Sequence, residues 1–425
     1  MKAFLRSRRF AWVCVLLLAL LLRARSASAY SVLSHEELVD LLWQGQIQPL
    51  LMGRYPALTP VQLNQAHAYA YGGAVIQDLG YYPFGSAFFS NLMHYVRSGE
   101  FVMELIRQSQ SPDEFAFALG ALSHYAGDTV GHPDSVNQAV AIEYPKLRAR
   151  YGKYVTYPED RVAHLKTEFG FDMEQVALHR YAPQQYHDFI GFQVSKALLQ
   201  RVFPLVYGLP LATVLPNDNL AIGTFRWSVS QVIPEMTQVA LQVHGKDMMR
   251  EDPTFAKRKF LYRLSRADYV KSWGGDYQRP GWATRLLGLL VRLLPKVGPL
   301  RALAFNAPTA QTENLYIQSI NASVDQYRKF LAAVGTDTLM LPDDDLDDGK
   351  LAGRGESTLV DATYCQWLSA LAASHYSSTD QALRANLLRF YAGLAAEPAA
   401  ARDRKARAAA LSNLAQLRRQ TVLIY

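Results

Sequence analysis

The sequence contains very little cysteine, with only Cys14 and Cys365 among its 425 residues. Cys14 lies in an N-terminal segment that we expect to be removed, so the remaining chain cannot form an internal disulfide. An exported chain of this kind depends on its hydrophobic core or on bound metal for stability. Half of the residues are apolar, which is enough to bury a large core in one big domain or in two.

The sequence also lacks an apolar run of the length that a membrane span usually needs. The run near the N-terminus, residues 10–22, spans 13 residues, which is short for a membrane span. Basic residues within 2–9 precede it and Ala-Ser-Ala at 27–29 follows it, which is the pattern of a secretory signal peptide cleaved before Tyr30. We therefore expect a signal peptide over residues 1–29 and an exported protein, periplasmic or secreted. Two arginines just before the cleavage site leave an uncleaved, membrane-associated form as the alternative.

A large charge of one sign is absent once residues 1–29 are set aside. The whole chain carries 44 Lys and Arg against 37 Asp and Glu, but six of the basic residues and no acidic one lie in that segment. The remaining chain has 38 basic and 37 acidic residues and a net charge near +1. Grooves for polyanions usually need a basic surface, so we expect no nucleic-acid partner.

Alternating strand patterns are scarce, and the chain has no internal repeat. Apolar residues instead recur at spacings of three and four, as in HEELVDLLWQGQ (35–46) and DEFAFALGALSHYAGD (113–128), which predicts amphipathic helices. The expected fold class is all-α, a multi-helix domain with additional helical segments toward the C-terminus. The expected division is a signal peptide at 1–29, a helical domain at 30–340, an acidic linker at 341–350 and a helical extension at 351–425.

Two charged segments stand out within this division. Residues 250–305 hold 12 Lys or Arg against 4 acidic residues. Arg285, Arg292 and Lys296 form a cationic stripe there on an otherwise apolar helix, as in an interfacial helix on anionic lipid. A buried helix whose charges reach the surface fits this stripe equally well. The acidic run PDDDLDDG at 342–349 lacks the glycine position of an EF-hand loop, so we expect a solvated linker there.

The stretch HYAGDTVGH places His124, Asp128 and His132 four residues apart. Four residues turn a helix by about 400°, so the three side chains share one face. Two imidazoles that flank a carboxylate are a metal-ligand arrangement. A second pair, His164 and Glu168 in HLKTE, has the same spacing. Each piece alone also fits a surface ion pair or a satisfied core group.

Further candidate ligands precede this motif. They are Asp78 in AVIQDLGYYPFG, His94 in NLMHY, and the segment YSVLSH, in which Tyr30 would become the first residue and His35 the sixth. The free amine and the carbonyl of Tyr30 can chelate a cation in a five-membered ring, with His35 as the next ligand. All these candidate ligand motifs, occurring together and in this order, are hard to explain without a metal site.

This order of motifs, over about residues 30–200, resembles the zinc-dependent phospholipase C family, whose all-helical fold is shared with fungal single-strand nucleases. The resemblance implies two to three zinc ions in a cleft. By position, the first ion would be held by Asp78, His94, His124 and Asp128, its neighbour by Tyr30, His35 and Asp128, and the third by His132, His164 and Glu168.

Three departures from the family pattern bear on the substrate. The family's usual first residue is Trp, where this chain has Tyr30. Only three residues separate Asp128 from His132, where secreted bacterial phospholipases and the nucleases have five. This shorter spacing is similar to that of glycosylphosphatidylinositol-specific phospholipase D. The chain also extends well beyond the compact secreted enzymes.

The resemblance implies a chemistry as well. Two zinc ions bridged by Asp128 would share a water whose pKa falls toward neutrality, Asp78 would orient that water or take its proton, and the third ion would stabilise the departing alkoxide. We therefore expect an exported zinc-dependent phosphodiesterase that hydrolyses phospholipid head groups at a membrane surface. The alternatives are a nuclease or nucleotidase of the same fold and a non-catalytic lipid-binding envelope protein. Head-group preference, C-type or D-type cleavage and oligomeric state stay open.

Other polar and aromatic residues near the motifs have less certain roles. His67 is interpreted as a satisfied core histidine, with contact to a metal ligand as the alternative. His179 and His187 are expected to pack at a helix junction. The aromatic run YYPFG at 81–85 fits ordinary packing, and a place along the substrate cleft is the alternative.

Overall fold

The computed structural model describes residues 32–177, 192–229, 305–394 and 404–419. These residues form helices and turns with one small two-stranded sheet, which confirms the all-α prediction. Within them, no helix is long and apolar enough to cross a membrane. The expected signal peptide and residues 250–304 of the basic segment lie outside the described residues. The proposed domain division stays a prediction.

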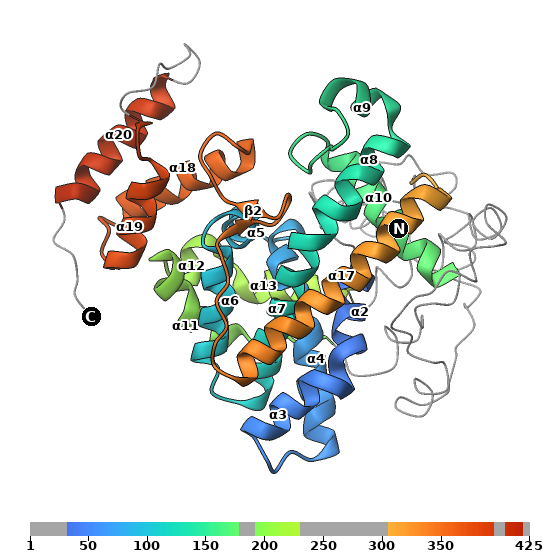
Figure 1. Ribbon diagram of the computed structural model, residues 1–425. Helices are drawn as coiled ribbons and strands as arrows, with labels where there is room; N and C mark the ends of the chain where they lie inside the picture. Colours follow the sequence, from blue (N-terminus) through green and yellow to red (C-terminus); the bar gives the residue numbers. More distant parts are fainter. Residues whose placement is uncertain (1–31, 178–191, 230–304, 395–403, 420–425) are drawn as a thin grey trace, which may run out of the picture.

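The helices lie in the four described stretches of the chain (Figure 1). Before the first gap lie α2 (Val32–Leu42), η1 (Trp43–Ile47), α3 (Gln48–Arg54), α4 (Pro60–Ala74), η2 (Ile76–Tyr81), α5 (Ala87–Tyr95), α6 (Ser98–Gln108), α7 (Pro112–Gly131), η3 (His132–Val136), α8 (Asn137–Glu143), α9 (Pro145–Tyr151) and α10 (Arg161–Ala177). The second stretch holds α11 (Lys196–Tyr207), α12 (Leu211–Val214) and α13 (Asp218–Trp227). The third holds α17 (Ala310–Gly335), the strands β1 (Asp344–Asp345) and β2 (Lys350–Leu351), and then α18 (Thr358–Ala373) and α19 (Gln381–Phe390). The fourth holds α20 (Arg404–Arg419).

Helix α7 carries the HYAGDTVGH motif up to Gly131, and His132 begins η3 directly after it. Its first turn has the expected signals: the Ser111 hydroxyl accepts the Glu114 N–H at 3.2 Å, Pro112 follows the cap, and acidic side chains face the positive end of the helix dipole. From Phe115 to Asp128 every side chain is buried. A helix that is buried all round needs neighbours on each side, and α4 and α17 pack along it.

Glycines allow α4 and α7 to approach closely. A Cβ added to Gly73 would lie 1.9 Å from the Phe117 carbonyl oxygen, and one added to Gly120 would lie 2.0 Å from that of Ala70. Real side chains never tolerate such distances, so both positions need glycine at this crossing. On another side of α7, the Tyr327 hydroxyl of α17 donates to the Leu119 carbonyl at 2.9 Å. The motif helix is therefore fixed by backbone contacts as well as by apolar packing.

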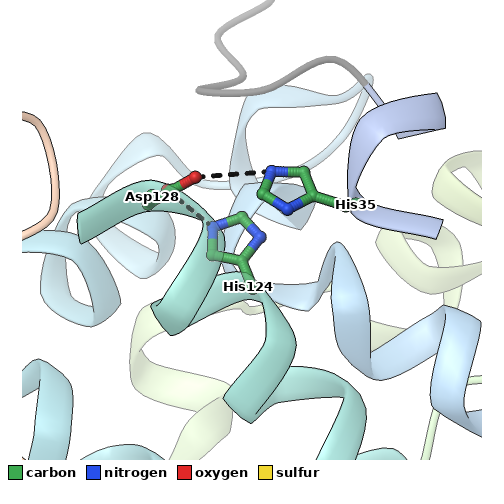
Figure 2. Close-up of side chains that lie close together, drawn as sticks. All are labelled: His35, His124 and Asp128. Carbon is green, nitrogen blue, oxygen red and sulfur yellow. Dashed lines mark ion pairs between the residues drawn. The ribbon is translucent and has the colours of Figure 1, made fainter. Parts of the chain in front are cut away.

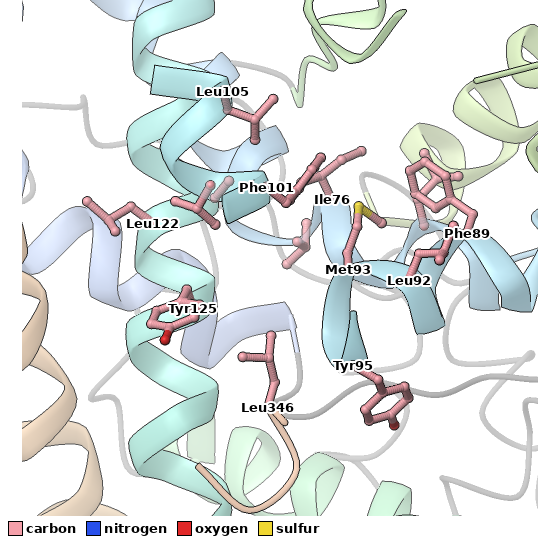
Figure 3. Packing of buried hydrophobic residues seen from close by; sticks show 14 of the residues in the cluster. Ile76, Phe89, Leu92, Met93, Tyr95, Phe101, Leu105, Leu122, Tyr125 and Leu346 are labelled. Carbon is pink, nitrogen blue, oxygen red and sulfur yellow. The ribbon is translucent and has the colours of Figure 1, made fainter. Parts of the chain in front are cut away.

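The C-terminal helices join the same apolar core. Trp367 on α18 is fully buried and its indole N–H donates to the Tyr207 carbonyl of α11 at 2.8 Å. Figure 3 shows the core around α5, α6 and α7, with Leu346 from the segment between α17 and α18 pointing into it beside Tyr95 and Tyr125. The C-terminal part of the chain thus contributes to the core that surrounds α7.

The acidic run at 342–349 is not a solvated linker, and the prediction for this run is wrong. Asp345 is 5% exposed, Leu346 0% and Asp347 3%. The run forms a short antiparallel hairpin in which Asp344 pairs with Leu351, and the Leu346 N–H donates to the His94 carbonyl at 3.1 Å. Burial of Leu346 in the core draws its acidic neighbours inside, where hydrogen bonds offset part of their desolvation.

Candidate metal centre

Helix α7 sets the geometry of the centre. His124 and Asp128 lie one turn apart on it, both fully buried, with 3.0 Å between His124 Nε2 and Asp128 Oδ2. His132 follows at the junction of α7 and the wide turn η3. Because α7 is enclosed by other helices, these side chains meet groups from elsewhere in the chain rather than solvent.

Asp78 from η2 and His94 from α5 approach His124 from one side. His94 Nε2 lies 3.5 Å from Asp78 Oδ1, 3.5 Å from His124 Nε2 and 3.6 Å from Asp128 Oδ2. The ligand atoms of Asp78, His94 and His124 all lie within 4.8 Å of one another. Four candidate ligands from three separate elements therefore converge at one point.

His35 from α2 approaches the other oxygen of Asp128. Its Nε2 lies 3.4 Å from Asp128 Oδ1, and its ring stacks on that of His124 with centroids 4.2 Å apart (Figure 2). Gly127 makes this approach possible, since an added Cβ would lie 2.9 Å from Leu38 Cδ1 and 3.4 Å from His35 Nδ1. Asp128 thus directs Oδ1 toward His35 and Oδ2 toward His124 and His94. A carboxylate that bridges two metal ions needs this arrangement.

Backbone carbonyls fix which nitrogen of each imidazole carries the proton. His94 Nδ1 lies 2.9 Å from the Ser90 carbonyl, and His124 Nδ1 lies 2.9 Å from the Ala74 carbonyl. A carbonyl can only accept, so each Nδ1 donates and each neutral ring turns its Nε2 lone pair toward the cluster. Two nitrogen lone pairs then face each other across 3.5 Å beside carboxylates, and a cation between them satisfies all of these groups.

The distances fit zinc. A tetrahedral ion with ligands about 2.0–2.1 Å away separates those ligands from one another by about 3.3–3.4 Å. The separations between the candidate ligand atoms range from 3.0 to 3.6 Å. Imidazole and carboxylate ligands are also those that zinc prefers. Donor chemistry and spacing therefore agree.

Burial and charge act in opposite directions on these histidines. Burial, reinforced by the neighbouring histidines, lowers the pKa of His35 well below its usual value, and burial also lowers the pKa of His94 to about 3. For His124, burial lowers the pKa, but the carboxylates of Asp128 and Asp78 outweigh it and raise the value to about 9. The neutral imidazole is the form that binds metal, so a cation at this cluster would take the place of the proton that the carboxylates otherwise hold on His124 Nε2. The carboxylates supply the negative charge that balances the cation.

A third cluster lies at the end of α7. Its members are His132, His164 and Glu168, which are all buried and have ligand atoms within 4.8 Å of one another. His164 Nδ1 lies 2.9 Å from Glu168 Oε1, while Glu168 Oε2 has no hydrogen-bond partner among the described residues. Burial and then the neighbouring carboxylates raise the pKa of Glu168 well above its usual value.

Asn137 orients the third cluster and was missed by the sequence analysis. Its amide nitrogen donates to the main-chain carbonyl of Asp347 at 2.8 Å, which leaves its oxygen 2.8 Å from His164 Nε2. That oxygen can only accept, so His164 carries its proton on Nε2 and turns the Nδ1 lone pair toward Glu168. A single asparagine in a helix carries no sequence signal for such a role.

Asp347 is the other residue that the sequence analysis missed. Its Oδ1 lies 3.6 Å from His132 Nδ1, and Tyr95 donates to its Oδ2 at 2.8 Å. Burial and the charge of Asp345 raise the pKa of Asp347 well above its usual value. Asp345 and Asp347 flank Leu346 in the acidic run. The sequence analysis interpreted the whole run as a solvated segment and so did not identify Asp347.

Aromatic side chains surround the clusters. Tyr81 packs 5.9 Å from the His94 ring, Tyr157 packs 5.9 Å from the His164 ring, and the two tyrosines lie 6.4 Å apart. Both are nearly buried. Phe84, from the same aromatic run as Tyr81, is 46% exposed. Tyr82 packs against Phe225, so the run divides between the metal centre, ordinary packing and the surface.

His67 lies outside the three clusters, as the core interpretation expects. Its Nε2 is 2.9 Å from Asp40 Oδ1, Tyr71 donates to the same oxygen, and Trp43 stacks on its ring with centroids 3.8 Å apart. This group ties α2 to α4 and so helps to place His35. Tyr30, His179 and His187 lie outside the described residues.

The start of α2 is anchored by a carboxylate. Asp172 of α10 accepts the Leu33 N–H at 3.0 Å and the Ser34 hydroxyl at 2.7 Å, and Tyr316 OH lies 2.8 Å from Ser34 Oγ. An acceptor at a helix N-terminus satisfies main-chain donors and interacts favourably with the dipole. The chain is therefore held in place just before His35.

The sequence pattern of the family described as zinc dependent phospholipase C matches residues 34–215. No curated protein and no solved structure matches the chain. The matched segment contains every candidate ligand that the structure describes in the three clusters, and it ends before Asp347. Three clusters that can each hold an ion agree with the expected two to three zinc ions.

Proposed function

We propose that this chain is an exported phospholipid-hydrolysing enzyme that cleaves head-group phosphodiesters at its three-cluster metal centre, because the pattern of the zinc-dependent phospholipase C family matches residues 34–215. The observation that supports this most strongly is the pair of Nε2 lone pairs of His94 and His124, held 3.5 Å apart beside Asp78 and Asp128. A stability role alone does not require Asp78 at this position.

The proposed ligand sets follow the clusters. Asp78, His94, His124 and Asp128 would hold one ion, and His132, His164 and Glu168 would hold the third. His35 and Asp128 would hold the remaining ion together with the amine and carbonyl of Tyr30, a residue outside the described part of the chain. When bound, zinc supplies Lewis acidity for a phosphoryl oxygen and lowers the pKa of water toward neutrality.

The residues of the chain supply position and proton transfer. Asp128 would offer one carboxylate oxygen to each of two neighbouring ions, since Oδ1 faces His35 and Oδ2 faces His124. The Ser90 and Ala74 carbonyls keep His94 and His124 in the tautomer that binds metal. Asp78 Oδ1 lies 3.5 Å from His94 Nε2 at the same point and is placed to orient the attacking water or accept its proton. Tyr81 and Tyr157 are buried against the His94 and His164 rings.

One assay separates this function from its alternatives. The chain beginning at Tyr30, purified with zinc, is offered phosphatidylcholine vesicles, a water-soluble phosphodiester and single-stranded DNA, each with and without a chelator. We expect chelator-sensitive hydrolysis of the phospholipid above all. Preferential cleavage of DNA would instead identify a nuclease, and no cleavage of any substrate by zinc-loaded protein would identify a binding protein.

Export itself is proposed from the signal-peptide pattern at residues 1–29. Cleavage would create the free amine of Tyr30 near α2, whose start is anchored by Asp172. Adding one residue before Tyr30 moves that amine along the chain by about 3.5 Å. We predict that this extension lowers zinc content and phospholipid hydrolysis together, whereas full activity in the extended protein would refute the N-terminal ligand and leave the other positions intact.

A further inference from the structure

A tight turn at residues 82–85 connects η2 to α5, both of which supply candidate metal ligands. The Gly85 N–H donates to the Tyr82 carbonyl at 2.9 Å, with Pro83 and Phe84 between them. Proline at the second position and a φ of +63° at Phe84 are the geometry of a type II turn. Glycine or asparagine normally takes the third position of such a turn, so a phenylalanine there is unusual.

The phenylalanine in this turn is strained and exposed at the same time. A bulky side chain at positive φ raises the free energy of the folded state. Burial of the Phe84 ring in the core would offset this cost, but Phe84 is 46% exposed. Strained residues persist mainly where the strained conformation serves a function. The turn therefore presents an apolar ring at the surface where a glycine would fit the backbone better.

Helix α13 adds two more exposed apolar side chains beside this turn. The Thr224 hydroxyl of α13 donates to the Pro83 carbonyl at 2.6 Å, which places this face of the helix against the turn. Leu220 lies four residues before Thr224 and Trp227 three residues after it, so both share that face. Leu220 is 47% exposed and Trp227 is 55% exposed. Phe84, Leu220 and Trp227 thus form one surface region, which we call the apolar patch.

The charge beside the apolar patch is positive. Arg226 precedes Trp227 and is exposed, and its Nε donates to the Phe192 carbonyl at 2.8 Å, which fixes the guanidinium near the patch. Asp218, the acidic residue of α13, is neutralised by Lys196 at 2.9 Å. Tryptophan with apolar side chains and an adjacent arginine is the composition of surfaces that enter the boundary between lipid head groups and acyl chains. A phosphate-bearing lipid surface therefore complements the patch in both polarity and charge.

We propose that Phe84, Leu220 and Trp227 insert into the surface of a phospholipid membrane, with Arg226 at the phosphate groups, and hold the metal centre at the level of the head groups. The choice of lipid as the partner rests on the proposed function, whose substrate lies in such a surface. Phe84 follows Asp78 by six residues, which span at most about 20–22 Å when extended. The apolar patch and the metal centre can therefore serve one lipid surface, and exposed apolar patches commonly mark such contacts.

The first test offers one head group in two physical states. Zinc-loaded protein that begins at Tyr30 receives short-chain phosphatidylcholine as monomers, below its critical micelle concentration, or long-chain phosphatidylcholine in vesicles. Phe84→Asn replaces the ring with a polar side chain that tolerates positive φ. Hydrolysis of subsaturating vesicles should fall about 10-fold, since burial of a phenylalanine side chain is worth about 10–100-fold in an equilibrium constant. Hydrolysis of monomers should stay unchanged, and the variant should unfold at the same or a higher denaturant concentration.

The matched control is Val61→Asn on α4, which removes an apolar side chain that is 75% exposed and should change neither rate. Equal losses on monomers and vesicles in Phe84→Asn would make Phe84 part of the substrate cleft and overturn the proposal. Unchanged hydrolysis of vesicles would overturn it as well. Sedimentation covers one more partner: a dimer that dissociates in Phe84→Asn would identify a second copy of the chain as the occupant of the patch, against the proposal.

A second test does not depend on catalysis. In protein with Cys365→Ser, an environment-sensitive fluorophore is attached through Phe84→Cys or, as the control, through Val61→Cys. Directly after mixing with phosphatidylcholine vesicles, we expect a blue shift and quenching by brominated acyl chains for the fluorophore at position 84 only. If the protein hydrolyses phospholipid but this fluorophore stays in water, the inference fails while the proposed function stands. If the fluorophore enters the membrane but no phospholipid is hydrolysed, the proposed function fails and the membrane-contacting surface stands.

Discussion

At the scale of single residues, the centre depends on groups that fix the direction of lone pairs. Ser90 and Ala74 do this through carbonyls for His94 and His124, and Asn137 does it through its amide for His164. Asp128 adds the bridge, with one oxygen 3.4 Å from His35 and the other 3.0 Å from His124. Ligand identity alone therefore describes only part of the site.

Asp128→Asn tests the bridge. The substitution removes a negative charge and one ligand oxygen that two ions would share, so we expect both ions of this pair to be lost while the third remains. Phospholipid hydrolysis should fall by at least about 100-fold, because loss of even an outer hydrogen-bond partner of a ligand costs about 10–100-fold. Zinc analysis and initial rates measure both effects. Asp134→Asn, at an exposed position four residues before Gln138, is the control, and equal activity in Asp128→Asn and the control would end the two-ion mechanism.

Asn137→Ala tests orientation without removing a ligand. The substitution deprives His164 Nε2 and the Asp347 carbonyl of their partner. We expect about 10–100-fold weaker binding of the third ion, with the other two unchanged. Competition with a zinc-sensitive dye measures the affinities. The neighbouring Gln138→Ala removes only contacts to the Pro133 and Asp134 carbonyls and should bind like the unsubstituted protein; equal binding by both variants would remove Asn137 from the site.

At the scale of elements, the centre is built around α7. Helix α4 crosses α7 closely at Gly73 and Gly120, which brings the Ala74 carbonyl of α4 to 2.9 Å from His124 Nδ1. The α7 motif was predictable from the sequence because its spacing of four residues survives in any helix. The close crossing of α4 and α7 was not predictable, because a glycine within a helical pattern indicates a less stable helix and does not by itself indicate a helix contact.

Gly73→Ala tests the crossing. The added methyl group would lie 1.9 Å from the Phe117 carbonyl, so α4 and α7 must separate. Overpacking of this kind costs about 1–3 kcal/mol or more in the free energy of unfolding, and zinc affinity should fall with it. Gly53→Ala, where nothing lies within 4 Å of the added Cβ, should instead be neutral or stabilising by up to about 1 kcal/mol. Denaturant unfolding distinguishes the two, and equal stability would contradict the tight crossing.

At the scale of the whole molecule, the sequence predicted the all-α class and the ligands whose motifs are local. It did not predict that the C-terminal part of the chain returns to the centre. Tyr95 and Asp347 lie 252 residues apart, and no periodicity reports a contact of that range. The acidic run was misread because five carboxylates in eight residues ordinarily indicate solvent, whereas buried Leu346 and the hydrogen bonds of Asp345 and Asp347 fix this run inside.

The most direct test of the whole account is the number of zinc ions per chain in protein that begins at Tyr30, measured together with phospholipid hydrolysis as zinc is removed and restored. We predict two to three ions per chain, hydrolysis that stops when the ions bound around Asp128 are chelated, and recovery when zinc is added back. Undiminished hydrolysis by protein that holds less than one zinc ion per chain would contradict the account.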